Sequence, residues 1–514
     1  MPNSSKFKLT GEQQAIIDAD EDLMAITAYA GTGKTFTLRA FAENHPRERM
    51  LYLAYNKAMA EESKRAFANC PNVEVRTIHS LAYGQVGHKY SAKLGDIRPF
   101  NLLPFVRPVK NSSQDDQYFL AKEILLCLND FFVSRSPSLE AFLKENKRKI
   151  KIKLSGPKQR PKDMTKLVEK VWGESRDGKF TMPHNGYLKL FQMDPGKSLD
   201  RYDRILVDEA QDLNDCMIDL VINSRPKKIF VGDPYQQIYG FNGAVNALSK
   251  KDLNGAARYF LTQSFRCPLP TAAIANQYLT LLGAPKPFTG VANPPEGQGA
   301  PGNLVIARTN AGLFDFVAKN LPDKLFHYNG GFDGYQFYTI LDLVYLINKQ
   351  ANRIKDTFIK QFASLEEIEN YAEKVNDSVC LTRIKIAKRY KNDAFQIYDQ
   401  MTRTMAEEPR ADYIATTAHK IKGREYKNVI LLEDFAKLTD IVGQGHKVKE
   451  IRDKTGSLPT DFKCRVNLEE IRLLYMAITR SKNELTLLPA YHLSDDLIDD
   501  FHALAAEGCI EVID

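Results

Sequence analysis

Eight residues near the start of the chain have the types and order of a phosphate-binding loop. They read AYAGTGKT and follow a short apolar run from Leu23 to Thr27. Glycines let backbone N–H groups approach the phosphates, Lys34 would neutralise the β and γ charges, and the Thr35 hydroxyl would bind Mg²⁺. An isolated match of this kind can also be a Gly-rich turn at a strand end. The candidate nucleotide-binding residues are Ala28, Ala30, Gly31, Thr32, Gly33, Lys34 and Thr35, with Ala28 in place of the usual first Gly.

Two carboxylates after a second apolar run supply the other half of such a site. Ile205 to Val207 is of buried-strand type, and Asp208 and Glu209 follow it. Open α/β sheets bind ligands at the carboxyl ends of their strands, where Asp208 would hold Mg²⁺ and Glu209 would orient an attacking water. Alone, an acidic cluster after a strand is more often a solvated turn. Together with the loop at 28–35, it predicts ATP hydrolysis with Mg²⁺, in which Lys34, Asp208 and Glu209 take part.

The elements that position these residues follow from the apolar pattern. Short apolar runs alternate with helical patterns at 35–44 and 56–69, and this alternation predicts an α/β fold with parallel sheets covered by helices. The strands expected first lie at 23–27, 50–54, 73–76, 204–207, 228–232 and 258–262. A second group lies at 303–307, 412–416, 428–432 and 484–488.

Two interruptions of this alternation define the expected domains. Each of two parallel-sheet domains contains a mainly helical insertion, because helical and charged stretches separate its strand patterns. The first domain is expected at 1–84 and 201–265, with a basic insertion at 85–200. The second is expected at 266–350 and 409–514, with a small helical insertion at 351–408.

Length and composition limit the class of protein. A chain of 514 residues, 43% hydrophobic and 26% charged, is ordinary for a globular protein with several cores. No stretch approaches the roughly 20 apolar residues of a membrane span. The seven cysteines include no CxxC pair, and the start has no signal-peptide pattern. We therefore expect a cytoplasmic, soluble and reduced protein that does not enter a membrane.

The positive charge is concentrated in one segment. The net charge is only +7, but residues 141–180 carry thirteen Lys or Arg against five Asp or Glu. A patch of this kind attracts a polyanion such as DNA in a salt-dependent way. The alternative is a solvated basic loop that only aids solubility.

Nine segments occur in the order of a known motif series. In that order they resemble the motifs of UvrD/Rep-type superfamily 1 DNA helicases, and the resemblance covers nearly the whole chain. The chain looks most like the F-box DNA helicase branch at 183–190, 232–248 and 354–390. The nine segments are residues 9–13, 28–35, 55–57, 77–80, 208–212, 231–244, 261–266, 417–426 and 475–480.

The resemblance implies two RecA-like domains with ATP in the cleft between them. Arg266 and Arg480 match arginine fingers, which suits the bidentate contacts that guanidinium groups make with phosphate. For either arginine alone, a surface salt bridge is the default interpretation. The other implied ATP contacts are Gln13 and Phe265 at the adenine, Gln236 at the γ-phosphate and Glu425 at the ribose.

The resemblance also implies a track for single-stranded DNA, with aromatic rings on the bases and polar groups on the phosphates. Tyr55, Tyr239 and Phe241 match stacking positions. Without the resemblance, Tyr55 and Phe241 would be interpreted as core aromatics, and His79 as a buried histidine. Asn242 stands where the family usually has Arg, so we expect weaker or differently coupled DNA binding there. The implied backbone contacts are Asn56, Lys57, Thr77, His79, Arg308, His419 and Lys422.

The function implied is ATP-dependent translocation on single-stranded DNA and separation of duplexes, in repair, recombination or replication. The resemblance alone implies 3′ to 5′ polarity. The phosphate loop begins only nineteen residues after Leu9, so we expect no F-box region and no ubiquitin-ligase partner, and 34 residues after Arg480 leave no room for a nuclease. The rival hypothesis is a DNA-sensing or scaffold ATPase within a defence or recombination complex, without processive unwinding. Single strands and duplex junctions are the expected partners.

Overall fold

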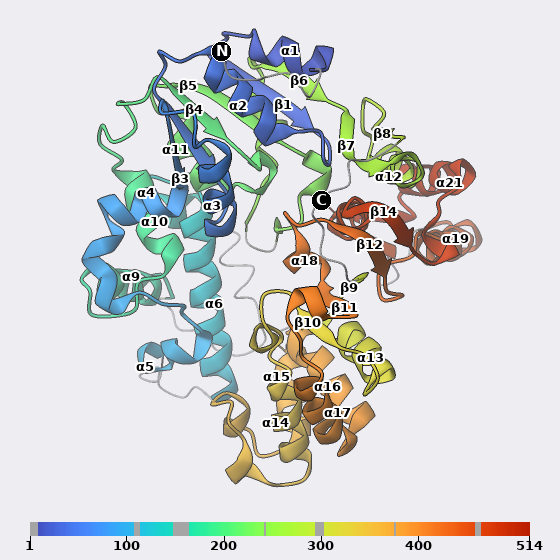
Figure 1. Ribbon diagram of the computed structural model, residues 1–514. Coiled ribbons are helices and arrows are strands. Elements are labelled where there is room, and N and C mark those ends of the chain that lie inside the picture. Colours follow the sequence, from blue (N-terminus) through green and yellow to red (C-terminus); the bar gives the residue numbers. More distant parts are fainter. Residues whose placement is uncertain are drawn as a thin grey trace. The chain divides into compact units, whose positions relative to one another are not determined.

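The structure is a computed structural model that describes residues 9–106, 114–146, 164–240, 243–292, 303–374, 377–457 and 464–513. The chain divides into two compact units, each containing a parallel sheet and helices (Figure 1). The first unit consists of Met1–Thr27, Lys34–Gly232 and Tyr239–Phe260, and the second of Ala28–Gly33, Asp233–Ile238 and Leu261–Asp514. The division therefore runs through the phosphate-loop sequence, between Gly33 and Lys34.

The sheet of the first unit has six strands in the order β3-β2-β4-β5-β1-β6. Leu53 pairs with Val207, and Thr27 pairs with Gly232, in parallel registers. The carboxyl ends of these strands therefore lie along one edge of the sheet. The strands are β1 (Leu23–Ala28), β2 (Met50–Ala54), β3 (Val73–Thr77), β4 (Arg204–Val207), β5 (Lys227–Gly232) and β6 (Ala257–Leu261).

Helices of the first unit begin where these strands end, and side chains cap several of them. Asn56 Oδ1 accepts from Met59 N at the start of α3, and Thr77 forms a capping box with Ser80 at the start of α4. Such caps satisfy backbone N–H groups that have no partner in the helix. The helices next to the sheet are α1 (Gly11–Ile17), α2 (Lys34–Asn44), α3 (Lys57–Ala66), α4 (Ile78–Gln85) and α11 (Asp215–Ile222).

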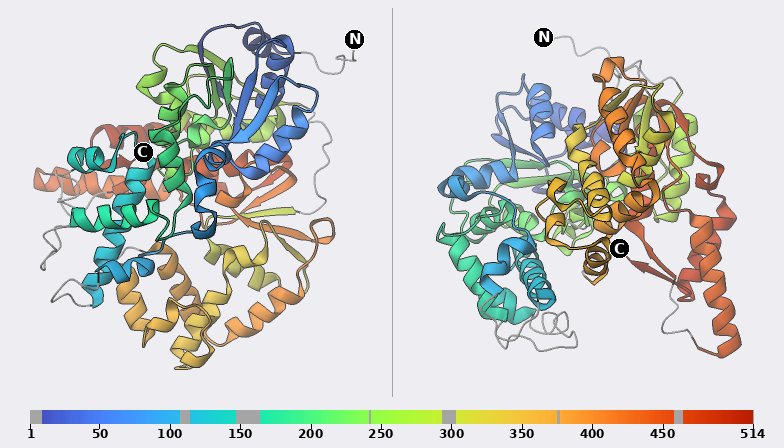
Figure 2. Two further views of the ribbon diagram at one scale, coloured as in Figure 1. Left: turned by 90° about the vertical axis from the view of Figure 1, so that its left-hand side faces the viewer. Right: turned by 90° about the horizontal axis from the view of Figure 1, so that it is seen from below.

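A helical segment separates β3 from β4. Helix α6 packs on α9 and α10, and α10 packs on α4 (Figure 2). Rings of Phe131, Phe132 and Trp172 form the core of this segment. Eight of the thirteen basic residues of the predicted patch lie at 147–163, outside the described residues. The helices are α5 (Leu103–Val106), α6 (Gln114–Val133), α7 (Leu139–Glu145), α9 (Met164–Arg176) and α10 (His184–Met193).

The second unit contains a parallel five-stranded sheet in the order β10-β11-β9-β12-β14 and two separate strand pairs, β7 with β8 and β13 with β15. The predicted α/β class with two parallel sheets is confirmed. The strands are β7 (Gln263–Pro268), β8 (Thr289–Val291), β9 (Asn303–Ala307), β10 (Phe326–Tyr328), β11 (Tyr413–Thr417), β12 (Tyr426–Leu431), β13 (Cys464–Asn467), β14 (Ser481–Thr486) and β15 (Ile510–Ile513).

One hydrophobic core joins the sheet of the second unit to the small helical segment after α14. Phe314 on α13, Leu343 on α14, Ile384 on α16 and Met401 on α17 all belong to it. The segment is therefore packed into the unit and is not a separate lobe. The helices are α12 (Leu269–Leu281), α13 (Asn310–Asn320), α14 (Tyr338–Ile347), α15 (Leu365–Lys374), α16 (Ser378–Tyr390), α17 (Asp393–Arg403), α18 (Ala418–Ile421), α19 (Leu438–Thr455), α20 (Leu468–Ile478) and α21 (Asp495–Ala506).

All seven cysteines are free and buried. Within the described ranges, no helix has both the length and the apolar character that a bilayer crossing needs.

Candidate functional site

Two predicted catalytic residues, Lys34 and Glu209, meet a third polar residue, Gln211, at the edge of the first sheet. Lys34 Nζ donates to Glu209 Oε1 at 2.9 Å, and Gln211 Nε2 donates to the other carboxylate oxygen. Glu209 is only 8% exposed and has a φ of 51°, in the left-handed region that is uncommon for residues other than glycine. Such conformations concentrate at functional sites because the surrounding structure must hold them. The structure thus holds a carboxylate next to the lysine expected to bind phosphates.

Tyr52 brings the two expected metal ligands together. Its hydroxyl donates to Asp208 Oδ2 at 2.5 Å and also forms a hydrogen bond with the Thr35 side chain. Burial, followed by the charge of Glu209, raises the pKa of Asp208. Hydroxyl and carboxylate oxygens are ligands that suit Mg²⁺, which in such sites also binds nucleotide phosphates. Among the described residues, no cluster of three His, Cys, Asp or Glu suited to a metal occurs.

Gln13, the expected adenine contact, is buried at the start of α1. Its Oε1 accepts from Thr10 N at 3.1 Å in a capping box, and its Nε2 donates to Thr37 Oγ1 at 3.3 Å. These bonds fix the orientation of the amide. The adenine contact itself stays a prediction.

In the second unit, the residues of the phosphate loop lie against β7. Gly31 has a φ of 67°, and a Cβ atom there would lie 2.5 Å from Arg266 Cβ. Phe265 N donates to Gly31 O at 2.8 Å, and Ser264 Oγ donates to Ala30 O at 3.0 Å. Only glycine fits position 31, because both the backbone conformation and the close approach exclude a side chain.

Gln236 is held by three of its neighbours. Arg480 Nη2 donates to its Oε1 at 3.0 Å, its Nε2 donates to Asp233 Oδ2 at 2.7 Å, and Lys422 Nζ donates to its backbone carbonyl at 2.8 Å. Tyr475 OH also donates to Asp233 Oδ2, at 3.1 Å. A predicted γ-phosphate contact, a predicted arginine finger and a predicted DNA contact therefore form one network.

The second predicted arginine finger forms an ion pair. Arg266 Nε contacts Glu425 Oε2, and Lys482 Nζ contacts Glu425 Oε1 at 2.5 Å. Burial acts to raise the pKa of Glu425, but Arg266 and Lys482 outweigh it, so the pKa is lowered. A nucleotide phosphate that binds Arg266 would have to replace the Glu425 carboxylate.

In the first unit, Tyr55, Asn56, Lys57, Thr77 and His79 lie where β2 and β3 pass into helices, and Tyr239 lies after β5. The rings of Tyr55 and Tyr239 stack, with centroids 5.4 Å apart and an interplanar angle of 17°. His79 Nε2 hydrogen-bonds to Asn185 Oδ1 at 3.1 Å, and burial lowers the pKa of His79. Asn56 and Thr77 cap α3 and α4, as described above, while Lys57 is exposed. The predicted Phe241 and Asn242 lie outside the described residues.

In the second unit, Arg308 follows β9 and His419 follows β11. Arg308 Nε donates to Glu470 Oε2 at 2.7 Å, so its guanidinium is paired with a carboxylate. Burial, with a further contribution from the charge of Arg308, lowers the pKa of His419 to about 4. His419 is therefore neutral near pH 7.

Sequence reasoning missed the partners that hold these residues. No motif spacing points to these partners. Two of them, Gln211 and Asp233, nevertheless lie inside the motif segments 208–212 and 231–244. Their polar types after buried strands were the available signal. These partners are Tyr52, Gln211, Asp233, Glu470 and Lys482.

Comparisons with known proteins agree with the geometry. Residues 9–254 match the UvrD/REP helicase N-terminal domain. The chain is 29% identical to F-box DNA helicase 1 of Gallus gallus over 99% of this chain and 51% of that protein. It is 29% identical to F-box DNA helicase protein 1 of Schizosaccharomyces pombe over 93% of this chain and 57% of that protein. A probable DNA helicase II homolog of Mycoplasma genitalium is 38% identical over 16% of this chain and 13% of that protein. The chain spans about half the length of the first two relatives.

Proposed function

We propose that this chain, whose residues 9–254 belong to the UvrD/REP helicase N-terminal domain family, is an ATP-driven translocase on single-stranded DNA that separates duplexes. The observation that carries the proposal is the group of side chains at the edge of the first sheet. There Lys34 contacts Glu209, and Tyr52 bonds to both Thr35 and Asp208. These are the residues that ATP hydrolysis requires after a phosphate loop.

In the proposed reaction, water attacks the γ-phosphorus of ATP and the bond to the bridging β-γ oxygen breaks, giving ADP and phosphate. Lys34 neutralises phosphate charge, and Glu209 orients the water and accepts its proton. A Mg²⁺ ion held by Thr35 and Asp208 would neutralise further charge on the phosphates. The proposal assigns charge stabilisation in the transition state to Arg266 and Arg480 of the second unit.

The link between DNA and hydrolysis rests on Gln236. Lys422 and Arg480 both donate to this residue, one to its backbone and one to its side chain. A phosphate of DNA that draws Lys422 away would free one contact of Gln236 and shift the network that holds Arg480. Binding of DNA is thus expected to change the rate of ATP hydrolysis.

Single-stranded DNA is the proposed track because ring stacking tolerates any base. Tyr55 and Tyr239 already stack on each other, and β2, β3, β9 and β11 each lead into a helix that begins beside a predicted contact. Helix N-termini are favourable positions for phosphate. This arrangement supports binding along a strand without base recognition at those positions.

Strand displacement tests the proposal. Duplexes with a 3′ or a 5′ single-stranded tail are incubated with ATP and Mg²⁺, and the Lys34→Ala variant is the control. We expect separation of the 3′-tailed duplex by the wild-type protein only. Hydrolysis stimulated by DNA without separation of either duplex would favour the rival function, a DNA-sensing ATPase in a partner complex.

A further inference from the structure

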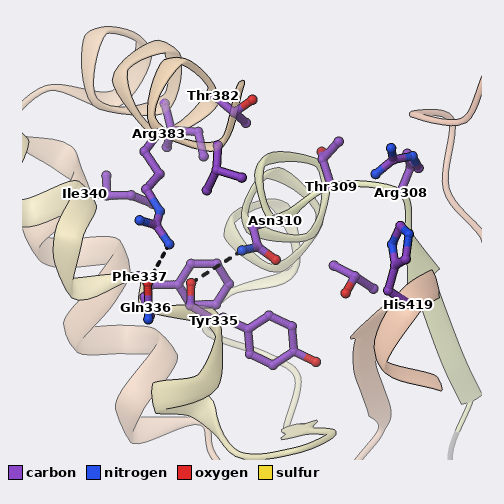
Figure 3. Close-up of a pocket in the computed structure, with 13 residues that line it drawn as sticks. Arg308, Thr309, Asn310, Tyr335, Gln336, Phe337, Ile340, Thr382, Arg383 and His419 are labelled. Carbon is purple, nitrogen blue, oxygen red and sulfur yellow. Dashed lines mark hydrogen bonds between the residues drawn. The ribbon is translucent and has the colours of Figure 1, made fainter. Parts of the chain in front are cut away.

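The second unit contains a cavity that the proposed function does not use in full. It has a volume of about 430 Å³, within the range of roughly 300–1,000 Å³ typical of small-molecule sites. Side chains from α13, α14, α16 and the turn before α14 line it (Figure 3). We call it the insertion pocket, because α16 belongs to the small helical segment after α14.

The two sides of the insertion pocket differ in origin. Arg308 and His419, both predicted DNA contacts, lie on one side in Figure 3, and Gln336 and Arg383 lie on the other. Asn310 lies between them and donates to Tyr335 O at 3.5 Å. The pocket therefore extends from the proposed DNA track to Gln336 and Arg383, which lie outside the nine motif segments.

The charge of the lining suits a nucleotide. None of the 13 lining residues is acidic, while Arg308 and Arg383 are cationic. Glu470 pairs with Arg308, and the charges of Asp377 and Asp356 act on Arg383, although neither of these carboxylates forms an ion pair with it within the described ranges. A phosphate group and a polar base edge would both be attracted to such a lining.

Gln336 is held in an unusual backbone conformation at this position. Its φ is 53°, in the left-handed region, and its Oε1 accepts from Arg383 Nη2 at 2.7 Å. Strained residues of this kind persist only where the surrounding structure holds them, and they concentrate at ligand sites. In this bond the Gln336 oxygen already accepts from Arg383. The pair can therefore offer a ligand the NH₂ group of Gln336 and the remaining N–H groups of Arg383, all of which are donors.

A donor-rich edge of this kind matches guanine better than adenine. Guanine presents two adjacent acceptors, N7 and O6, on one edge, whereas adenine presents N7 beside an N6 donor. Paired donors from Gln336 and Arg383 can satisfy guanine without a donor facing a donor. The apolar side chains of Ile340 and Val379 in the lining would cover the faces of a planar ring.

We propose that the insertion pocket binds one guanine nucleotide of the single strand, with its phosphate toward Arg308 and His419 and its base edge on Gln336 and Arg383. The inference rests on the proposed function, because it takes the strand to pass Arg308 and His419. It adds base recognition at one position to a track that otherwise tolerates any sequence. Translocation is then expected to slow at guanines.

The test measures binding of labelled oligothymidine strands by fluorescence anisotropy. A single central guanine should tighten binding by about fivefold relative to a central adenine, thymine or abasic position. Arg383→Ala and Gln336→Ala should remove this preference, and Arg383→Lys should remove it while retaining affinity for oligothymidine. Arg389→Ala is the matched control, because Arg389 is exposed on the same helix outside the pocket and should leave the preference unchanged.

Two further measurements, competition by free GMP and DNA-stimulated hydrolysis, distinguish a free nucleotide from a guanine in the strand and the guanine site from the proposed function. Competition by free GMP that depends on Arg383, without any effect of guanine in the strand, would contradict a site for the strand. Equal affinity for all central bases in the wild-type protein would overturn the inference, while DNA-stimulated hydrolysis would leave the proposed function standing. Absence of both DNA binding and stimulation would reject the proposed function itself.

Discussion

At the scale of single residues, Glu209 has the clearest chemical assignment. It is buried, adopts a left-handed backbone and contacts both Lys34 and Gln211. Replacement by glutamine keeps the shape of the side chain but removes the base. We expect Glu209→Gln to retain ATP binding and to lower kcat by at least about 100-fold, the usual contribution of a positioned acid or base.

Nucleotide binding by fluorescence and steady-state hydrolysis check this prediction together. Glu61→Gln is the control, because Glu61 is exposed on α3 and pairs only with Lys64 among the described ion pairs. Turnover by Glu209→Gln near the wild-type rate would remove Glu209 from the role of base.

His419 gives a prediction about pH. Its pKa is about 4 in the folded protein, mainly because of burial, and about 6.5 in an unfolded chain. Between these values the unfolded state binds more protons, so the free energy of unfolding falls as the pH is lowered from 6.5 toward 4. The stabilising contribution of neutral His419 is fully present above pH 6.5.

Urea denaturation at pH 7 and pH 5 measures this effect. We expect the wild-type protein to lose more stability than His419→Asn over this interval. His492→Asn, which replaces an exposed histidine, should behave as the wild type does. Equal losses in the wild type and His419→Asn would contradict the low pKa.

At the scale of elements, the carboxyl end of β5, where the chain turns, is tightly constrained. A Cβ atom at Gly232 would lie 2.1 Å from Gln211 Oε1 and 2.9 Å from the backbone nitrogen of Ala210. Gly232→Ala should therefore lower the free energy of unfolding by about 1–3 kcal/mol, as overpacking does. It should also slow hydrolysis, because Gln211 holds Glu209.

Chemical denaturation and an ATPase assay test this expectation. Gly11→Ala is the control, since no atom lies within 4 Å of a Cβ built there. Unchanged stability of Gly232→Ala would mean that the turn relaxes at little cost.

Much of the element pattern could be predicted from the sequence, because buried parallel strands are apolar throughout. Met50–Ala54 is buried at every position, and its predicted bounds of 50–54 are confirmed. The strand expected at 484–488 is β14, which begins earlier, at Ser481. Its start was missed because half of its residues are exposed and its apolar pattern is weak. The pair β13 and β15 was not predicted, because two strands of four residues depend on each other across the chain.

The contacts within the candidate sites could be predicted only in part. The phosphate loop could be predicted because its residues are consecutive in the sequence. Tyr52 and Asp208, by contrast, are 156 positions apart, and Arg308 and Glu470 are 162 positions apart. Only folding brings such pairs together. The left-handed backbone at Glu209 and Gln336 has no sequence signal either, since neither residue is glycine.

At the scale of the whole molecule, each unit has a parallel sheet whose strand ends lead into candidate contacts. The division between the units runs through the phosphate-loop sequence, so a single short segment belongs to both. A motor of the proposed kind requires ATP hydrolysis and DNA binding to influence each other.

The most direct test measures steady-state ATP hydrolysis by the purified protein with and without an unstructured single-stranded oligonucleotide, with Lys34→Ala as the control. We predict strong stimulation by the oligonucleotide in the wild-type protein and no hydrolysis above background in Lys34→Ala. Hydrolysis that depends on Lys34 but does not respond to DNA would contradict the account of a DNA-driven motor.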